Sequence, residues 1–191
     1  EMAALAGQDP LAWRRTLLAG DARAVGVLDS VAALSGWSTT AAPSGTARGI
    51  AFLKGFGSYI AMVAQVSKAS SGQVKVGKVF CAIDCGVAVN PDQIEAQVQG
   101  GIVHGLAATL WGQVLFANGK PNVSNFNNYR MLRLGEMPAV AVSIVPSTAA
   151  PGGVGETGVP CVAPAVANAW ARLTGLRQRV LPFYPGSTMG D

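Results

Sequence analysis

A single carboxylate stands inside a glycine-rich stretch near the end of the chain. Residues 151–160 read PGGVGETGVP, and the glycines remove side chains on both sides of Glu156. Backbone amides and the carboxylate could therefore both approach a bound group closely. Apolar residues at helical spacing predict a helix over 162–173, directly after this stretch. A glycine-rich loop that enters a helix has the outline of an anion or cofactor site, and Glu156 is the residue that we expect to carry the chemistry. The alternative is an exposed loop whose glycines only form turns.

A second group of polar residues lies on a predicted helix earlier in the chain. Asn90 can cap this helix and Pro91 can take its first position, so that it should run to about Trp111. Its core residues recur at helical spacing, and a sparsely decorated strip lies on another side: Gln93, Gln97, Gly100, Gly101 and His104. Glycine inside a helix costs about 1 kcal/mol relative to alanine, so some close approach must benefit from it.

Two interpretations of this strip remain open. The helix could pack on a strand through its small residues, with His104 as a hydrogen-bonded core histidine, which is the role that we expect for His104. For Gln97 a binding role is favoured, because an amide can both donate to and accept from a planar heterocycle.

Composition limits the class of protein. The chain has 191 residues, of which 50% are hydrophobic and 13% charged, which predicts one domain, or part of one, with much of its surface against other protein. The formal net charge is only +4 and the basic residues are scattered, which argues against nucleic-acid binding. The most apolar segment is interrupted by Gly55, Gly57 and Ser58, so we expect no membrane span. Since the sequence opens on Glu1, with neither an initiator Met nor the pattern of a signal peptide, we expect it to start in mid-sequence.

The cysteines favour neither a disulfide framework nor a protein-bound metal. They number three, at 81, 85 and 161, and the first two fall in one β-rich run. Along a strand, Cys81 and Cys85 would have Cα atoms about 13 Å apart, too far for a disulfide or for one zinc ion. With one histidine and no further cysteine, the chain by itself cannot hold a four-cysteine iron–sulfur cluster. We therefore expect no protein metal site, and any metal should arrive on a cofactor.

The elements around these segments predict an α+β fold, a mixed sheet with packed helices. Residues 1–37 should form a helical hairpin, with helix starts at Asp9-Pro10 and Asp21 and stops at Gly20 and Gly36. A loop over 38–46 should cross between layers. Residues 48–191 should form a strand-rich region with cofactor-facing helices. Its expected strands are 49–53, 57–66, 73–87 and 139–145, with a hairpin turn at Asn118-Gly119.

These segments resemble a known family. Gly153-Val154-Gly155-Glu156 and the following 159–169 are similar to the glutamate loop and next helix of the molybdenum hydroxylases, the xanthine dehydrogenase and aldehyde oxidase family. Segments 84–92, 97–101 and 125–129 agree with it in the same order. The chain looks most similar to large subunits of the isoquinoline 1-oxidoreductase type and of related bacterial aldehyde dehydrogenases.

The resemblance implies a cofactor and a role for each candidate residue. Residues 1–191 would be the C-terminal portion of a molybdopterin-binding large subunit, with Glu156 as the general base. Gln97 would contact the pterin of a molybdopterin cytosine dinucleotide that carries molybdenum. The residues implied to lie against this cofactor are Gly100, Gly101, Gly152, Gly153, Val154 and Gly155.

The implied reaction is hydroxylation of an N-heteroaromatic ring, or oxidation of an aldehyde, with water as the oxygen source. Electrons would leave through iron–sulfur clusters on a small partner subunit. The remainder of the large subunit would complete the substrate pocket, so that the chain alone should be inactive. Two other interpretations stay open: a non-catalytic assembly module that binds no cofactor, and a nucleotide-binding protein, which is disfavoured because no P-loop lysine or dinucleotide fingerprint accompanies the glycines.

Overall fold

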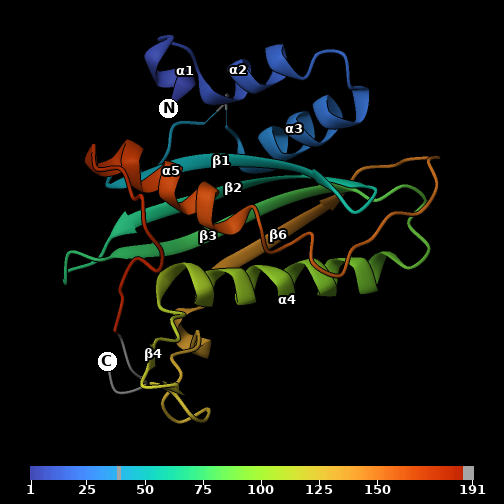
Figure 1. Cartoon of the computed structure of the whole chain (residues 1–191). Coiled ribbons are helices and arrows are strands. Elements are labelled where there is room, and N and C mark those ends of the chain that lie inside the picture. Colours follow the sequence, from blue (N-terminus) through green and yellow to red (C-terminus); the bar gives the residue numbers. More distant parts are fainter. Residues whose placement is uncertain (38–39, 187–191) are drawn as a thin grey trace.

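The protein is built around a mixed β-sheet (Figure 1). The computed structural model describes residues 1–37 and 40–186. Over this described part the main sheet has four strands in the order β1-β2-β3-β6. Their bounds are β1 Thr46–Gly55, β2 Ser58–Lys68, β3 Val74–Asp84 and β6 Ala139–Ile144. The first three strands are antiparallel and β6 pairs in parallel with β3, which confirms the α+β class with a mixed sheet.

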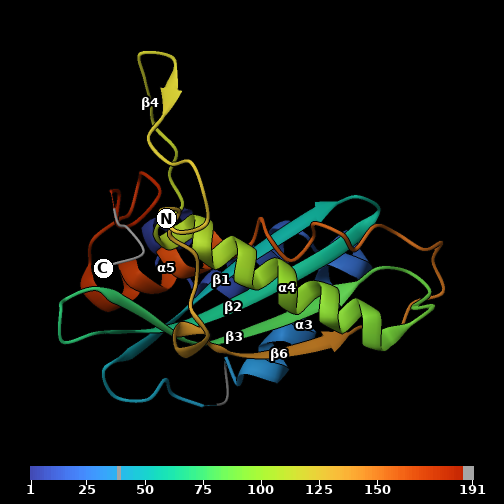
Figure 2. The same ribbon diagram turned by 90° about the horizontal axis from the view of Figure 1, so that it is seen from below.

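Helices cover both faces of this sheet (Figures 1 and 2). On one side lie α1 Met2–Leu5, α2 Pro10–Leu17 and α3 Ala22–Ser35. On the other side lie α4 Pro91–Leu110 and α5 Val162–Thr174. A small hairpin of β4 Phe116–Ala117 and β5 Lys120–Pro121 stands away from the body, and a 3-10 turn, η1, spans Leu134–Glu136. Among the described residues no helix is both long and apolar enough to cross a bilayer.

The helix starts are fixed by local capping, as the sequence predicts. The Asp9 carboxylate accepts hydrogen bonds from the backbone amides of Leu11 and Ala12, and Asp21 accepts one from Ala24. Asn90 caps α4 in the same way. Each cap satisfies an amide that the first turn of a helix leaves without a partner.

Two core layers follow from the alternation of side chains along β2. Ile60, Met62 and Ala64 face α4 and α5, whereas Ala61 and Val63 face α3. Successive residues of a strand point to opposite faces, so a central strand covered on both sides is apolar throughout.

Helix α5 lies directly on the edge strand β1. A Cβ added to Gly49 would sit 2.1 Å from the backbone nitrogen of Ala169, so only glycine allows this approach. The glutamate-bearing stretch that precedes α5 is thereby brought against the sheet.

The structure differs from the sequence-based expectation where β3 ends. The predicted strand ran to Val87, but β3 stops at Asp84 because the Asp84 carboxylate accepts a hydrogen bond from the amide of Gly86, whose φ is +75°. The chain turns there towards α4. Helix α1 and η1 were not predicted, and Ser38 and Thr39 of the expected crossing loop lie outside the described residues.

Candidate cofactor site

The segment 151–158, named here the glutamate loop, runs between the β1–β2 hairpin and helix α4. Its backbone is tied to both the hairpin and the end of β3. The amide of Gly152 donates to the carbonyl of Cys85 over 2.8 Å, and the amide of Gly153 donates to the carbonyl of Phe56 over 2.7 Å. The loop has no regular secondary structure, so these contacts determine its path.

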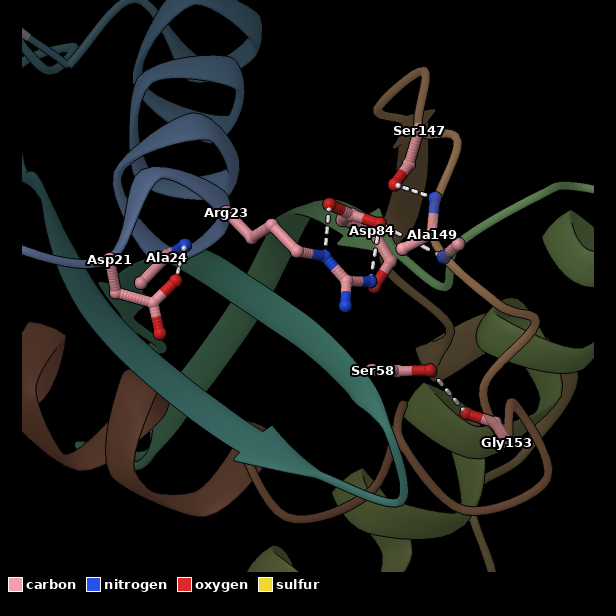
Figure 3. A network of polar contacts seen from close by, with 9 residues as sticks. Asp21, Arg23, Ala24, Ser58, Asp84, Ser147, Ala149 and Gly153 are labelled. Atoms are coloured by element: carbon pink, nitrogen blue, oxygen red, sulfur yellow. Dashed lines mark hydrogen bonds and ion pairs between the residues drawn. The ribbon is translucent and has the colours of Figure 1, made fainter.

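Two side chains add hydrogen bonds to the loop. The Ser58 hydroxyl donates to the carbonyl of Gly153 over 2.8 Å (Figure 3). From the other side, the Gln97 side-chain nitrogen donates to the carbonyl of Gly155, also over 2.8 Å. Since a carbonyl oxygen can only accept, the Gln97 amide must turn its nitrogen to the loop, which leaves its own oxygen as an acceptor for another group.

A cavity of about 440 Å³ opens between the loop, the end of β3 and the start of α4. Its walls are mainly apolar and include three amide side chains. The lining residues are Cys85, Val87, Val89, Asn90, Gln93, Ile94, Gln97, Pro151, Gly152, Val154 and Gly155. Apolar walls with a small number of hydrogen-bonding groups suit a flat, heteroatom-rich ligand.

The structure brings some of the predicted site residues together and separates others. Gln97, Gly152, Val154 and Gly155 line this one cavity, whereas Gly100, Gly101, Gly153 and Glu156 are not among its lining residues. Gln97 is 58 residues from Gly155 in sequence, so only the packing of α4 on the loop joins them.

Most of the loop glycines serve close packing of the protein on itself. A Cβ added to Gly152 would meet the Ser58 hydroxyl at 2.5 Å, and one added to Gly158 would meet the Val98 carbonyl at 2.7 Å. A Cβ added to Gly155 would find open space. Gly155 is therefore the loop glycine beside which a ligand has room.

The helix glycines divide in the same way. Gly101 is buried against the loop, where its added Cβ would lie 3.2 Å from the Cα of Gly158. The small-residue packing weighed for this helix thus occurs against a loop rather than a strand. Gly100 is exposed and an added Cβ there would touch nothing within 4 Å.

Glu156 is exposed, next to the cavity wall at Gly155. Its backbone carbonyl accepts from the amide of Val159 over 2.9 Å, and its neighbour Thr157 is buried. Across the described residues no hydrogen bond or ion pair engages the Glu156 carboxylate. The backbone of Glu156 is thus held in place, whereas its carboxylate oxygens stay available.

The expectation for His104 was wrong. His104 is exposed, because the buried side of α4 is formed by other residues, among them Val98, Ile102 and Leu106. On the helix, His104 shares a side with Gln97 and Gly100, which are also exposed, and so it lies off the buried stripe.

An ion pair supports the turn that leads into the cavity (Figure 3). Asp84, whose side chain is 4% exposed, pairs with Arg23 of α3 at 2.7 Å. Hydrogen bonding from the Arg23 guanidinium holds the pKa of Asp84 below its ordinary value. Arg23 also lies over the ring of Tyr59, 4.5 Å from its centroid.

All three cysteines are buried as free thiols. Burial raises the pKa of Cys161 to about 12 and also raises that of Cys81, so both thiols stay protonated. Within residues 1–37 and 40–186, no group of three His, Cys, Asp or Glu side chains could hold a metal ion.

Sequence reasoning missed several residues of this site. Cys85, Val87 and Val89 fall in a segment that carried the family resemblance, which was a usable signal. Ser58 gave none, because a serine at the start of a strand is ordinary and its partner lies 95 residues away.

The comparisons with known proteins identify the class. The molybdopterin cofactor-binding domain family model matches residues 30–138, more than half of the chain. The chain therefore belongs to this family. The glutamate loop lies beyond the matched residues.

Among individual proteins, the chain is 36% identical to isoquinoline 1-oxidoreductase subunit beta of Brevundimonas diminuta, over 93% of this chain and 23% of the relative. It is 32% identical to membrane-bound aldehyde dehydrogenase [pyrroloquinoline-quinone] of Gluconacetobacter polyoxogenes, over 95% of this chain and 26% of the relative. The chain thus spans about a quarter of the length of these relatives. Reconstituted CO dehydrogenase from Oligotropha carboxidovorans shares the fold, with a TM-score of 0.56 and 24% identity over 66% of this chain and 17% of that one.

Proposed function

We propose that this chain supplies the active-site glutamate and part of the cofactor site of a molybdenum hydroxylase. The observation that carries the proposal is the cavity of about 440 Å³ that Gln97 and the glutamate loop share, with the exposed Glu156 beside it. The proposed reaction is hydroxylation of an N-heteroaromatic ring, or oxidation of an aldehyde, with water as the oxygen source.

The residues around the cavity fit a pterin. Gln97 has an amide oxygen free to accept from a ring N–H, and Asn90 and Gln93 add further amides to the cavity lining. Val87, Val89 and Val154 offer apolar walls to a flat ring. We propose that these residues, with Gly152 and Gly155, hold a molybdopterin cytosine dinucleotide, and that Gly100, Gly101 and Gly153 border the same site. When bound, the molybdenum cofactor would take up the two electrons of the oxidation.

The chain's own chemical contribution would be proton transfer. Glu156 would accept a proton at a carboxylate oxygen as the general base, while the loop would fix the backbone that carries this side chain relative to the substrate. Because no group in the described part of the chain engages this carboxylate, it is available for this role.

The rest of the site would come from other chain segments. Exposed apolar side chains such as Val89, 80% exposed at the cavity rim, would be covered by the remainder of the large subunit. A small iron–sulfur subunit would carry the electrons away. The chain alone would then be inactive, as part of a larger assembly.

Elemental analysis of the intact enzyme tests the proposal. We expect about one molybdenum per copy of this chain and release of a cytosine nucleotide on acid hydrolysis. A fully active enzyme without molybdenum would overturn it.

The same sample is assayed for pyrroloquinoline quinone, because one relative is named for that quinone. If the quinone were present in place of molybdenum, the cavity would hold a different redox group. A guanine nucleotide would correct only the form of the cofactor. An inactive complex containing neither group would favour the assembly-module alternative.

A further inference from the structure

We propose that Ser58 is a positioning residue for Glu156. Together with Gln97 it forms a two-point clamp on the glutamate loop. The inference rests on the proposed role of Glu156 as the base. It concerns a residue of the β1–β2 hairpin that is absent from the residues lining the cavity.

The first point of the clamp is on the sheet side. Ser58 begins β2, is 1% exposed and donates its hydroxyl hydrogen to the carbonyl of Gly153 (Figure 3). The amide of the same Gly153 donates to the carbonyl of Phe56. Both polar backbone groups of Gly153 are therefore held by a hairpin that belongs to the central sheet. The close approach requires Gly152, since any Cβ there would collide with Ser58 and Gly57.

The second point is on the helix side. Gln97 of α4 holds the carbonyl of Gly155, two residues after the carbonyl held by Ser58. Val154 between them faces the cavity, and Glu156 follows directly after the second point. The direction in which Glu156 leaves the loop is thus set by donors from two elements that the core fixes relative to each other.

Losing one of the two hydrogen bonds of the clamp should make the glutamate loop more mobile while Glu156 itself stays in the site. A neutral hydrogen bond changes a local equilibrium by about two- to tenfold, so we expect a loss of that size in the rate of the chemical step. Losing both points should cost more, because the remaining donor would no longer restrain the loop.

The test uses Ser58→Ala in the complete enzyme complex. Three quantities are measured: molybdenum content, the single-turnover rate constant for reduction by substrate, and hydrogen–deuterium exchange of a peptide covering 150–160. The rate constant of the loaded enzyme does not depend on how much protein folds. Ser30→Ala is the matched control, since it removes a 3.0 Å hydrogen bond between Ser30 and Ser143, which connects α3 to β6 away from the loop.

We expect Ser58→Ala to keep its molybdenum, to reduce about two- to tenfold more slowly and to exchange faster over 150–160, with Ser30→Ala unchanged in all three. Ser58→Cys, which keeps the volume but donates weakly, should fall between wild type and Ser58→Ala and supplies the measurement if the alanine variant does not load. Wild-type rate and exchange in Ser58→Ala, or equal effects in Ser30→Ala, would overturn the clamp. Glu156→Gln is measured alongside. If that variant also reduces at the wild-type rate, the proposed role of Glu156 as the base is wrong. If Glu156→Gln is slow but Ser58→Ala is not, only the proposed role of Ser58 is wrong.

Discussion

The guanidinium of Arg23 donates hydrogen bonds to both oxygens of the Asp84 carboxylate, over 2.8 Å from Nε to Oδ2 and 2.7 Å from Nη2 to Oδ1. The pair connects α3, on one face of the sheet, to the last residue of β3. Asp84 also accepts from the amide of Gly86, so the same carboxylate shapes the turn that leads to the cavity. A surface helix is in this way coupled to the site on the far side of the sheet.

Removing Arg23 should destabilise the fold. Arg23→Ala leaves Asp84 buried and charged without its partner, and such a loss typically costs about 3 kcal/mol. Urea denaturation followed by tryptophan fluorescence measures the free energy of unfolding. Arg15→Ala is the control, because its pair with Asp29 has side chains 51% and 45% exposed and should contribute less than about 1 kcal/mol. Equal effects of the two variants would contradict a structural role for the Arg23 pair.

The same pair predicts how stability depends on pH. The pKa of Asp84 is lower in the folded protein than in the unfolded chain, where it is about 3.9. Its contribution is therefore complete above that value and is lost as the pH falls through the folded pKa. Unfolding free energies measured between neutral pH and pH 3 should decline less steeply in Asp84→Asn than in wild type. Parallel curves would show that other carboxylates dominate.

Glu156→Gln should abolish most turnover. The variant keeps the size and hydrogen bonding of the side chain but not its basicity, and general-base catalysis is worth about 10² to 10⁴-fold. The rate of reduction by substrate in a single turnover is the measurement, with molybdenum content unchanged. The control is Glu95→Gln, which changes an exposed glutamate on α4. This variant should be reduced by substrate at the wild-type rate. A Glu156→Gln enzyme that retains its molybdenum and is reduced at the wild-type rate would rule out Glu156 as the general base.

Gln97→Ala should lower the retention of the cofactor more than the rate of the chemical step. It removes both the donor to Gly155 and the amide oxygen that we assign to the pterin. Molybdenum per chain, measured after extended dialysis, should fall well below that of wild type. Gln99→Ala provides the comparison on the same helix, since the Gln99 side chain donates a hydrogen bond to Glu95 at the exposed surface, away from the loop. Full retention of molybdenum in Gln97→Ala would remove its proposed contact with the cofactor.

Expressed alone, the chain should associate. Phe116, Phe126 and Leu134, in the segment between α4 and β6, are 74%, 87% and 87% exposed. Large apolar side chains in this number favour contact with other protein. Light scattering should show oligomers that dissociate when the three residues are changed to serine. A stable monomer of the unchanged chain in dilute solution would argue against a buried context for this segment.

Much of the fold was predictable because it depends on neighbours in sequence. Asp9, Asp21 and Asn90 cap helices through amides two or three residues away. Alternation along β2 and the 3.6-residue period of α4 indicate which side chains become buried. The end of β3 was missed by three residues, because the Asp84 turn competes locally with an apolar run that would otherwise continue as a strand.

The sequence by itself determined most of the helices and strands of this protein and the pattern that marks its glutamate loop. Only the tertiary structure decided which residues support that loop. Gln97 and Ser58 reach it from 58 and 95 residues away, and no local pattern encodes either pairing. It also decided that Gly101 packs the protein on itself while Gly155 stays open to a ligand. The reason is physical: helix caps and periodicity act within a few residues, whereas a cavity exists only once distant elements have packed.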